Sequence, residues 1–297
     1  MQAAYRSTMI KILTIVAFVL LFGGLLYHFA ALKVFNLMVP KDAGSTLVGT
    51  MQHYGASADQ TLYIFKPNLA AEALPTLVFV HGGSWQEGDA ADYEFVGRAF
   101  AAKGFLTFVI NYRKHPQNPY PSFVEDVATA TAWASQHAND FGGDGSRLFL
   151  VGHSAGAYNV AMAVLDQHYM KDAGVNQKII KGIATMSGPF DFLPLDSPVT
   201  IATFGKVKDL ESTQPISFAR ADAPPFLILN GSADKTVYPR NAASLLKHLL
   251  EKGAPAKRKE YVGVSHAGIL LDLAKPLRSY APVLQDITNF FKDILKR

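Results

Sequence analysis

Four short segments carry the residues that could do chemistry in this sequence. The first, Gly152-His153-Ser154-Ala155-Gly156, stands between an apolar run at residues 147–151 and a helix-like stretch that begins at Ala155. In a G-x-S-x-G pattern the serine sits on a sharp strand-to-helix turn, and glycines on either side keep side chains out of that turn. The segment predicts Ser154 as a nucleophile. A glycine-serine helix cap is the simpler alternative.

The second segment, His81-Gly82-Gly83-Ser84-Trp85, follows the apolar run 76–80. Glycines let bare backbone N–H groups approach a substrate carbonyl oxygen. We expect the amides of Gly83 and Ser84, together with that of Ala155, to form an oxyanion hole. A tight turn between strand and helix is the alternative, and His81 is expected to brace the loop rather than to react.

A serine hydroxyl is a weak nucleophile at neutral pH, so a base and an orienting acid are needed downstream. Asp234, in Asn230-Gly231-Ser232-Ala233-Asp234, follows the apolar run 225–230, and His266, in Val264-Ser265-His266-Ala267-Gly268, follows the run 258–262. Open α/β sheets bind their ligands beyond the carboxyl ends of their strands, where both residues are expected. We therefore predict that His266 takes the serine proton and that Asp234 orients His266.

Other titratable residues rank lower. Asp191 follows a predicted strand but comes one strand too early for the acid, and Asp126 is expected to brace the loop at Asn111-Tyr112-Arg113. His153 should point away from Ser154 by strand alternation and serve in packing. There is no cysteine, so thiolate chemistry is excluded. No metal or other cofactor is expected, because no grouping typical of a metal site is formed by His53, His115, His137, His168 and His248.

From about residue 60 the chain alternates short apolar runs with longer helix-period segments, a pattern typical of an α/β protein with a mostly parallel sheet and helices on both faces. Strands are predicted at residues 61–66, 76–80, 106–111, 147–151, 181–187, 225–230 and 258–262. Helices are predicted at residues 91–103, 122–138, 155–167, 240–252 and 281–295. Residues 190–222 break this rhythm with several prolines and aromatic residues. We interpret them as a small cap-like insertion over the ligand-binding edge, with a long surface loop as the alternative.

Residues 12–32 contain no formally charged side chain. As a helix, 21 residues at 1.5 Å each span roughly 30 Å, the thickness of a bilayer's hydrocarbon core. Residues 1–40 are thus predicted to hold one N-terminal transmembrane anchor ahead of a hydrolase domain at 41–297. A cleaved signal sequence remains the alternative, although no small residue stands three positions before a cut after Ala30 or Ala31. Flanking charge weakly favours an inner-membrane protein with its catalytic domain on the periplasmic or extracytoplasmic side.

Composition excludes some other classes of protein. Hydrophobic residues make up 49% of the 297 residues and charged residues 18%, which excludes a disordered chain. The net charge of +4 comes mostly from Arg6, Lys11 and Lys33, and the rest of the chain carries 25 basic and 24 acidic residues. Because the basic and acidic residues of this part nearly cancel, the sequence does not predict nucleic-acid binding. The basic cluster at Lys252 and residues 257–259 is expected to be a solvated loop.

Taken together, HGGSW, NYRKHPQNPYPSFVEDV, GGDGSRLFLVGHSAG, SGPFDF, NGSADKTV and SHAG resemble the HGGxW carboxylesterase branch of the α/β-hydrolase superfamily. Hormone-sensitive-lipase-like esterases, feruloyl-esterase-like esterases and kynurenine formamidases belong to this branch. The resemblance covers about residues 60–295. It implies an α/β-hydrolase fold and a serine carboxylesterase that forms an acyl-enzyme and needs no cofactor. An arylformamidase-type amide hydrolase and a membrane-tethered, non-catalytic binding protein are the alternatives.

Two positions depart from the pattern of this branch. Ser84 stands where many relatives carry a third glycine, although its amide donor is retained. Tyr158 stands where a small residue is frequent, and it could narrow the substrate pocket. We expect Trp85, Tyr158 and Phe192 to line that pocket, and short-chain esters to be the substrates because the insertion is too small for a lipase lid.

Overall fold

The computed structural model describes residues 31–68 and 73–296. Of these, residues up to Val39 belong to one unit and those from Pro40 onward to a second. In the first unit residues 31–38 are helical. The predicted membrane segment, residues 12–32, lies almost entirely outside the described residues. Across the described ranges no helix has both the length and the apolar character needed to cross a bilayer.

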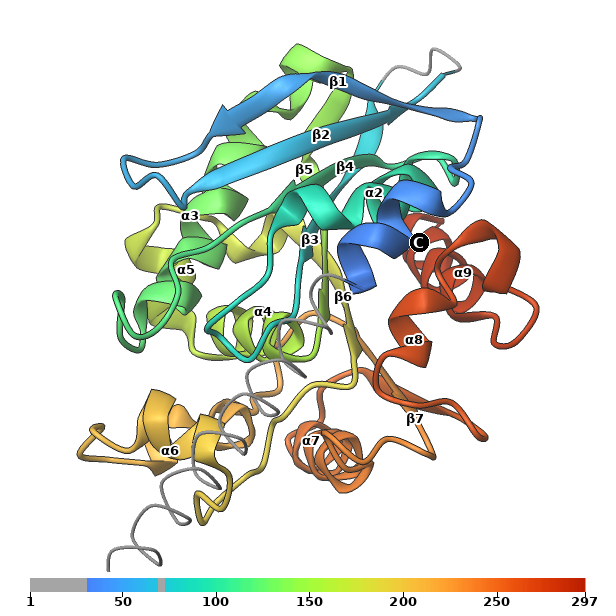
Figure 1. Ribbon diagram of the computed structural model, residues 1–297. Coiled ribbons are helices and arrows are strands. Elements are labelled where there is room, and N and C mark those ends of the chain that lie inside the picture. The colour runs from blue at the N-terminus through green and yellow to red at the C-terminus, as the bar shows by residue number, and fades with distance from the viewer. Residues whose placement is uncertain (1–30, 69–72, 297) are drawn as a thin grey trace, which may run out of the picture. The chain divides into compact units, whose positions relative to one another are not determined.

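A single eight-stranded sheet forms the centre of the second unit (Figure 1), with strand order β1-β2-β4-β3-β5-β6-β7-β8. The strands are β1 (Ser45–His53), β2 (Thr61–Pro67), β3 (Leu74–Val80), β4 (Leu106–Ile110), β5 (Gly143–His153), β6 (Ile180–Met186), β7 (Phe226–Gly231) and β8 (Ala256–Tyr261). β1 pairs antiparallel with β2, and β2 pairs antiparallel with β4. All further pairings, from β4 across to β8, are parallel. The mostly parallel sheet predicted from the sequence is confirmed, with β1 as an additional strand.

Burial along the strands explains the sequence pattern. Every residue of β4 and β7 is buried, as expected for parallel strands covered on both faces. β8 differs, because most of its residues are exposed or half-buried. The sequence analysis assigned residues 258 and 259 both to a strand and to a basic loop; the strand is confirmed and the loop was wrong, since residues 257–259 all lie within β8. Charged side chains are suited to a sheet edge because they discourage pairing with another chain.

Helices cover the two faces of the sheet (Figure 1). α2 (Glu94–Ala101) and α9 (Val283–Leu295) contact each other on one face, while α3 (Ser122–His137) and α4 (Ala155–Leu165) contact each other on the other. The remaining helices are α5 (Gln167–Asp172), α6 (Pro198–Phe204), α7 (Arg240–Glu251) and α8 (Gly268–Leu271). Short 3-10 turns are η1 (Ala90–Tyr93), η2 (Ala138–Phe141), η3 (Gln177–Ile179), η4 (Glu211–Thr213), η5 (Pro215–Phe218) and η6 (Lys275–Leu277).

The insertion at residues 190–222 contains α6, η4 and η5 and is held down by specific bonds. The Tyr158 hydroxyl donates to the carbonyl oxygen of Thr213 at 2.7 Å, and the Tyr120 hydroxyl donates to that of Ser212 at 3.1 Å. The last residue of α6, Phe204, is fully buried. The insertion therefore packs onto the body through buried contacts.

Candidate active site

Ser154 lies on a sharp turn between β5 and α4. Its backbone, at φ 54° and ψ −122°, is outside the regions that L-residues prefer, as is common at functional sites. The flanking glycines are required by close packing. A Cβ on Gly152 would lie 2.4 Å from the Gly156 carbonyl oxygen, and a Cβ on Gly156 would lie 2.2 Å from that of Val80. The local sequence thus places the serine at the carboxyl end of a central strand.

The structure brings together three side chains that are far apart in the sequence. Ser154 Oγ lies 2.9 Å from His266 Nε2, and His266 Nδ1 lies 2.8 Å from Asp234 Oδ2. Asp234 follows β7 and His266 follows β8, so both stand beyond the carboxyl ends of parallel strands. A carboxylate accepts the proton on Nδ1, which leaves Nε2 as the acceptor for the serine hydroxyl. This is the geometry that activates a serine nucleophile.

The environment of Asp234 keeps it ionised. Burial alone would raise the pKa of its carboxyl, but the hydrogen bond and charge of His266 and the amide of Val237 together hold that pKa below its usual range. The other carboxylate oxygen, Oδ1, accepts from the amides of Thr236 and Val237, each at 2.9 Å. Asp234 is thereby fixed in position and remains an acceptor for the imidazole N–H.

Donors for a developing oxyanion lie in the loop after β3 and at the start of α4. Ser84 and Trp85 both have positive φ angles, 54° and 59°. The carbonyl of Gly83 closes the turn by accepting from the amides of Gln86 and Glu87. Within the described residues, no hydrogen bond uses the amides of Gly83, Ser84 or Ala155. The oxyanion hole formed by these three amides stays a prediction.

His81 supports the loop that follows β3. This side chain is fully buried, and its Nε2 lies 3.2 Å from Asn111 Oδ1. The ring also stacks against Tyr112, with centroids 4.6 Å apart. His81 therefore supports the loop, as the sequence analysis expected.

Trp85, Tyr158 and Phe192 gather in one aromatic cluster. The Trp85 and Tyr158 rings meet edge to face at 5.2 Å, and Phe192 lies 5.9 Å from Tyr158. Sequence reasoning missed the centre of this cluster, Phe204, which lies 4.9 to 5.4 Å from each of the three rings. The only sequence signal was the run of scattered aromatic residues in the insertion. All four side chains are buried, so these rings are part of the packed interior, and their lining of a substrate pocket stays a prediction.

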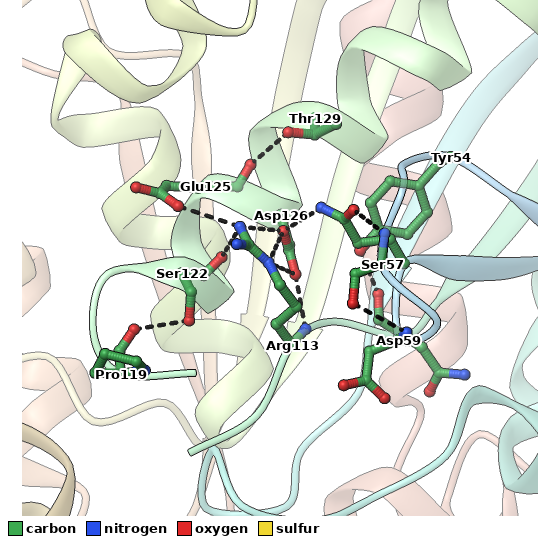
Figure 2. Close-up of polar contacts among 11 residues, drawn as sticks. Tyr54, Ser57, Asp59, Arg113, Pro119, Ser122, Glu125, Asp126 and Thr129 are labelled. Atoms are coloured by element: carbon green, nitrogen blue, oxygen red, sulfur yellow. Dashed lines mark hydrogen bonds and ion pairs between the residues drawn. The ribbon is translucent and has the colours of Figure 1, made fainter. Parts of the chain in front are cut away.

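Asp126 supports the loop after β4 rather than the reaction (Figure 2). Its carboxylate accepts from the Arg113 amide at 2.7 Å, from Arg113 Nε at 2.9 Å, and from Gln60 Nε2 at 2.7 Å. Asp191 accepts from the Ser244 hydroxyl at 2.5 Å and does not pair with His266. Both placements agree with the lower rank given to these carboxylates.

His153 has a role that the sequence analysis did not foresee. Its Nε2 lies 3.0 Å from the main-chain carbonyl oxygen of His266. The expectation of simple packing was therefore incomplete. As to metals, the described ranges 31–68 and 73–296 hold no group of three or more His, Asp and Glu side chains that could bind an ion.

This chain is similar in sequence to a known protein family and to several named proteins. Residues 62–249 match the BD-FAE family model. Esterase LipC of Mycobacterium tuberculosis is 27% identical over 261 residues, covering 81% of this chain and 64% of LipC. A probable isoprenylcysteine alpha-carbonyl methylesterase of Arabidopsis thaliana, ICMEL1, is 24% identical, covering 82% of this chain and 54% of that protein. The chain thus spans less than two thirds of the length of these relatives.

Solved structures share the fold at lower identity. A truncated carbohydrate esterase from gut microbiota superposes with a TM-score of 0.76 at 20% identity, covering 87% of this chain and all of that one. Esterase B from Lactobacillus rhamnosis, inhibited by a tributyrin phosphonate, gives 0.80 at 18% identity, covering 90% and 91%. The predicted α/β-hydrolase fold is confirmed. Because the matched residues 62–249 exceed half of the chain, this protein belongs to the BD-FAE family.

Proposed function

We propose that this chain is a serine hydrolase that cleaves carboxylic esters through an acyl-enzyme. The observation that carries the proposal is the hydrogen-bonded series Ser154–His266–Asp234 on a strained strand-to-helix turn. The backbone amides of Gly83, Ser84 and Ala155, which make no hydrogen bond within the described residues, are the donors proposed for the oxyanion. No cofactor takes part in this chemistry.

In this mechanism Ser154 Oγ attacks the ester carbonyl while His266 Nε2 takes its proton. Asp234 keeps the imidazole oriented and stabilises the cation that forms on it. The oxyanion is held by the backbone amides, where loss of one donor typically costs about 3 kcal/mol. His266 then protonates the leaving alcohol, and a water molecule activated by His266 releases the acid.

Short acyl groups are the proposed substrates. LipC and esterase B are named esterases, and esterase 2 of Thermogutta terrifontis, with a TM-score of 0.68, was solved with propionate bound. In this chain, Trp85 directly follows the oxyanion loop and Tyr158 lies one helical turn after Ser154. Phe204 packs between these two rings, which supports a closed end to the space beside the nucleophile.

The test is hydrolysis of p-nitrophenyl esters from acetate to octanoate by the full-length chain and by its Ser154→Ala variant. We expect Ser154-dependent activity that is highest for the short esters. N-formylkynurenine is assayed in parallel, and a faster reaction with it would favour the arylformamidase alternative. A folded chain that cleaves neither kind of substrate would favour the non-catalytic binding protein.

For the N-terminus we propose that residues 12–32 anchor the enzyme in the inner membrane with the catalytic unit on the periplasmic or extracytoplasmic side. The support is the stretch of 21 residues without a formal charge. Membranes washed with alkaline carbonate should retain the full-length chain. Its release, or an N-terminus that begins near Ala31, would instead indicate a cleaved signal sequence.

A further inference from the structure

His153 is a buried imidazole beside the candidate active site that the mechanism does not use. It is the last residue of β5 and is only 6% exposed. Its ring lies 5.0 Å from that of His266, centroid to centroid. Nε2 of His153 is 3.0 Å from the His266 carbonyl oxygen. A carbonyl oxygen only accepts, so this bond requires the proton of His153 to be on Nε2.

The other side of the ring faces the oxyanion loop. A Cβ added to Gly82 would lie 3.1 Å from His153 Nδ1, so the main chain at Gly82 packs directly against the imidazole. Nδ1 is buried and has no hydrogen-bond partner among the described residues. The ring therefore stands between the loop that would hold the oxyanion and the loop that carries His266.

The charged or titratable groups that act on His153 are His266 and Asp234. Burial, the largest cause, and the charge of His266 lower the pKa of His153 to about 3, although the hydrogen bond to the His266 carbonyl and the charge of Asp234 act to raise it. The ring is thus neutral whenever His266 works as a base. A neutral donor can hold the His266 main chain without repelling the imidazolium that forms during the reaction.

We propose that His153 is a positioning residue: its Nε2–H holds the main-chain carbonyl of His266 and so sets the distance between His266 Nε2 and Ser154 Oγ. The inference rests on the proposed hydrolase function. His266 lies in a loop after an exposed edge strand, so its placement depends on contacts such as this one. A misplacement of about 1 Å can cost about 100-fold in rate.

The test compares two substitutions at His153. The amide nitrogen of a glutamine can donate from nearly the same place as Nε2, whereas leucine and phenylalanine cannot donate. We expect His153→Leu to lower kcat for p-nitrophenyl butyrate about 10- to 100-fold with KM within about 2-fold. His153→Gln should recover most of that loss. His153→Phe serves as a second apolar variant should His153→Leu fail to fold.

Phe149→Leu is the matched control, since Phe149 is fully buried on the same strand and packs against Phe291 on α9. It should lower the free energy of unfolding while leaving kcat unchanged. Equal kcat values in His153→Leu and His153→Gln would overturn the inference. So would a comparable fall in kcat in Phe149→Leu, which would assign the effect to stability alone.

Two measurements do not depend on turnover. In a crystal structure of an apolar His153 variant, His266 Nε2 should have moved beyond hydrogen-bond distance of Ser154 Oγ; an unmoved His266 overturns the inference. In the wild-type chain, ¹⁵N NMR should find the His153 proton on Nε2, and a proton on Nδ1 overturns it. If both structural results are obtained but the wild-type chain cleaves no ester, the proposed function is contradicted instead.

Discussion

Acid should destabilise this fold through two buried imidazoles, those of His81 and His153. Burial lowers the pKa of His81 to about 4 and that of His153 to about 3, against about 6.5 for an imidazole in the unfolded chain. Between these values the unfolded chain binds protons that the folded chain does not. The free energy of unfolding must therefore fall as the pH falls below about 6.5.

The size of the effect follows from the same shifts. Each imidazole contributes about 1.4 kcal/mol per pH unit, so lowering the pH from about 7.5 to about 5 removes about 2 kcal/mol per residue and about 4 kcal/mol for the two. Asp272 opposes this change, because burial raises its pKa to about 6 and its folded form takes up a proton over the same range. A comparison of variants separates these contributions.

The assay is urea unfolding followed by tryptophan fluorescence at several pH values, for the wild-type chain and His153→Gln. Glutamine does not titrate, so the variant should lose about 2 kcal/mol less than the wild type between about pH 7.5 and about pH 5. His81 and Asp272 act equally in both chains and cancel. If the free energy of unfolding falls by the same amount in both chains over this pH range, the reasoning is refuted, whatever the difference between the two chains at any one pH.

Three further predictions concern individual residues. Phe204→Ala should open space beside Trp85 and Tyr158, so the ratio of kcat/KM for octanoate esters to that for butyrate esters should rise roughly tenfold. The free energy of unfolding should fall by about 3–5 kcal/mol. An unchanged kcat/KM ratio in folded protein would show that Phe204 does not limit the substrate pocket. Ser84→Gly should keep kcat/KM within about threefold, because the amide and not the hydroxyl is the donor. The free energy of unfolding in urea should rise by about 1 kcal/mol, because glycine adopts the φ of 54° without strain. A large fall in kcat would assign the hydroxyl a role. Asp234→Asn should lower kcat about 10⁴-fold without loss of folding, and a near-normal rate would show that another group orients His266.

Sequence patterns predicted most of the sheet because the parallel strands are apolar at consecutive positions. β1 was missed, since its residues are mostly half-buried or exposed and it contains Gly49, a residue type that is uncommon in strand interiors. The edge strand β8 was predicted at residues 258–262, but the charges at residues 257–259 were also interpreted as a solvated loop, because solvent-facing charged side chains occur in both settings. The strands buried on both faces were therefore the ones that the sequence identified without a conflicting interpretation.

Site residues could be predicted from the sequence where one motif specifies both the residue and the turn that holds it, as at Ser154 and at Gly83. Asp234 and His266 were found from their order and from their places after predicted strands. The contact between His153 and the His266 carbonyl could not be predicted, because it joins residues 113 positions apart and uses a main-chain atom. Phe204 was missed for a related reason: its aromatic partners come from four separate segments of the chain.

The most direct test of the central claim is covalent labelling with a fluorophosphonate, followed by intact-mass measurement and peptide mapping. The account predicts one adduct per chain, located on Ser154, and a labelling rate that falls sharply in His266→Ala. Labelling of a different residue, or labelling at an undiminished rate in His266→Ala, would contradict a nucleophile at Ser154 that is activated by His266.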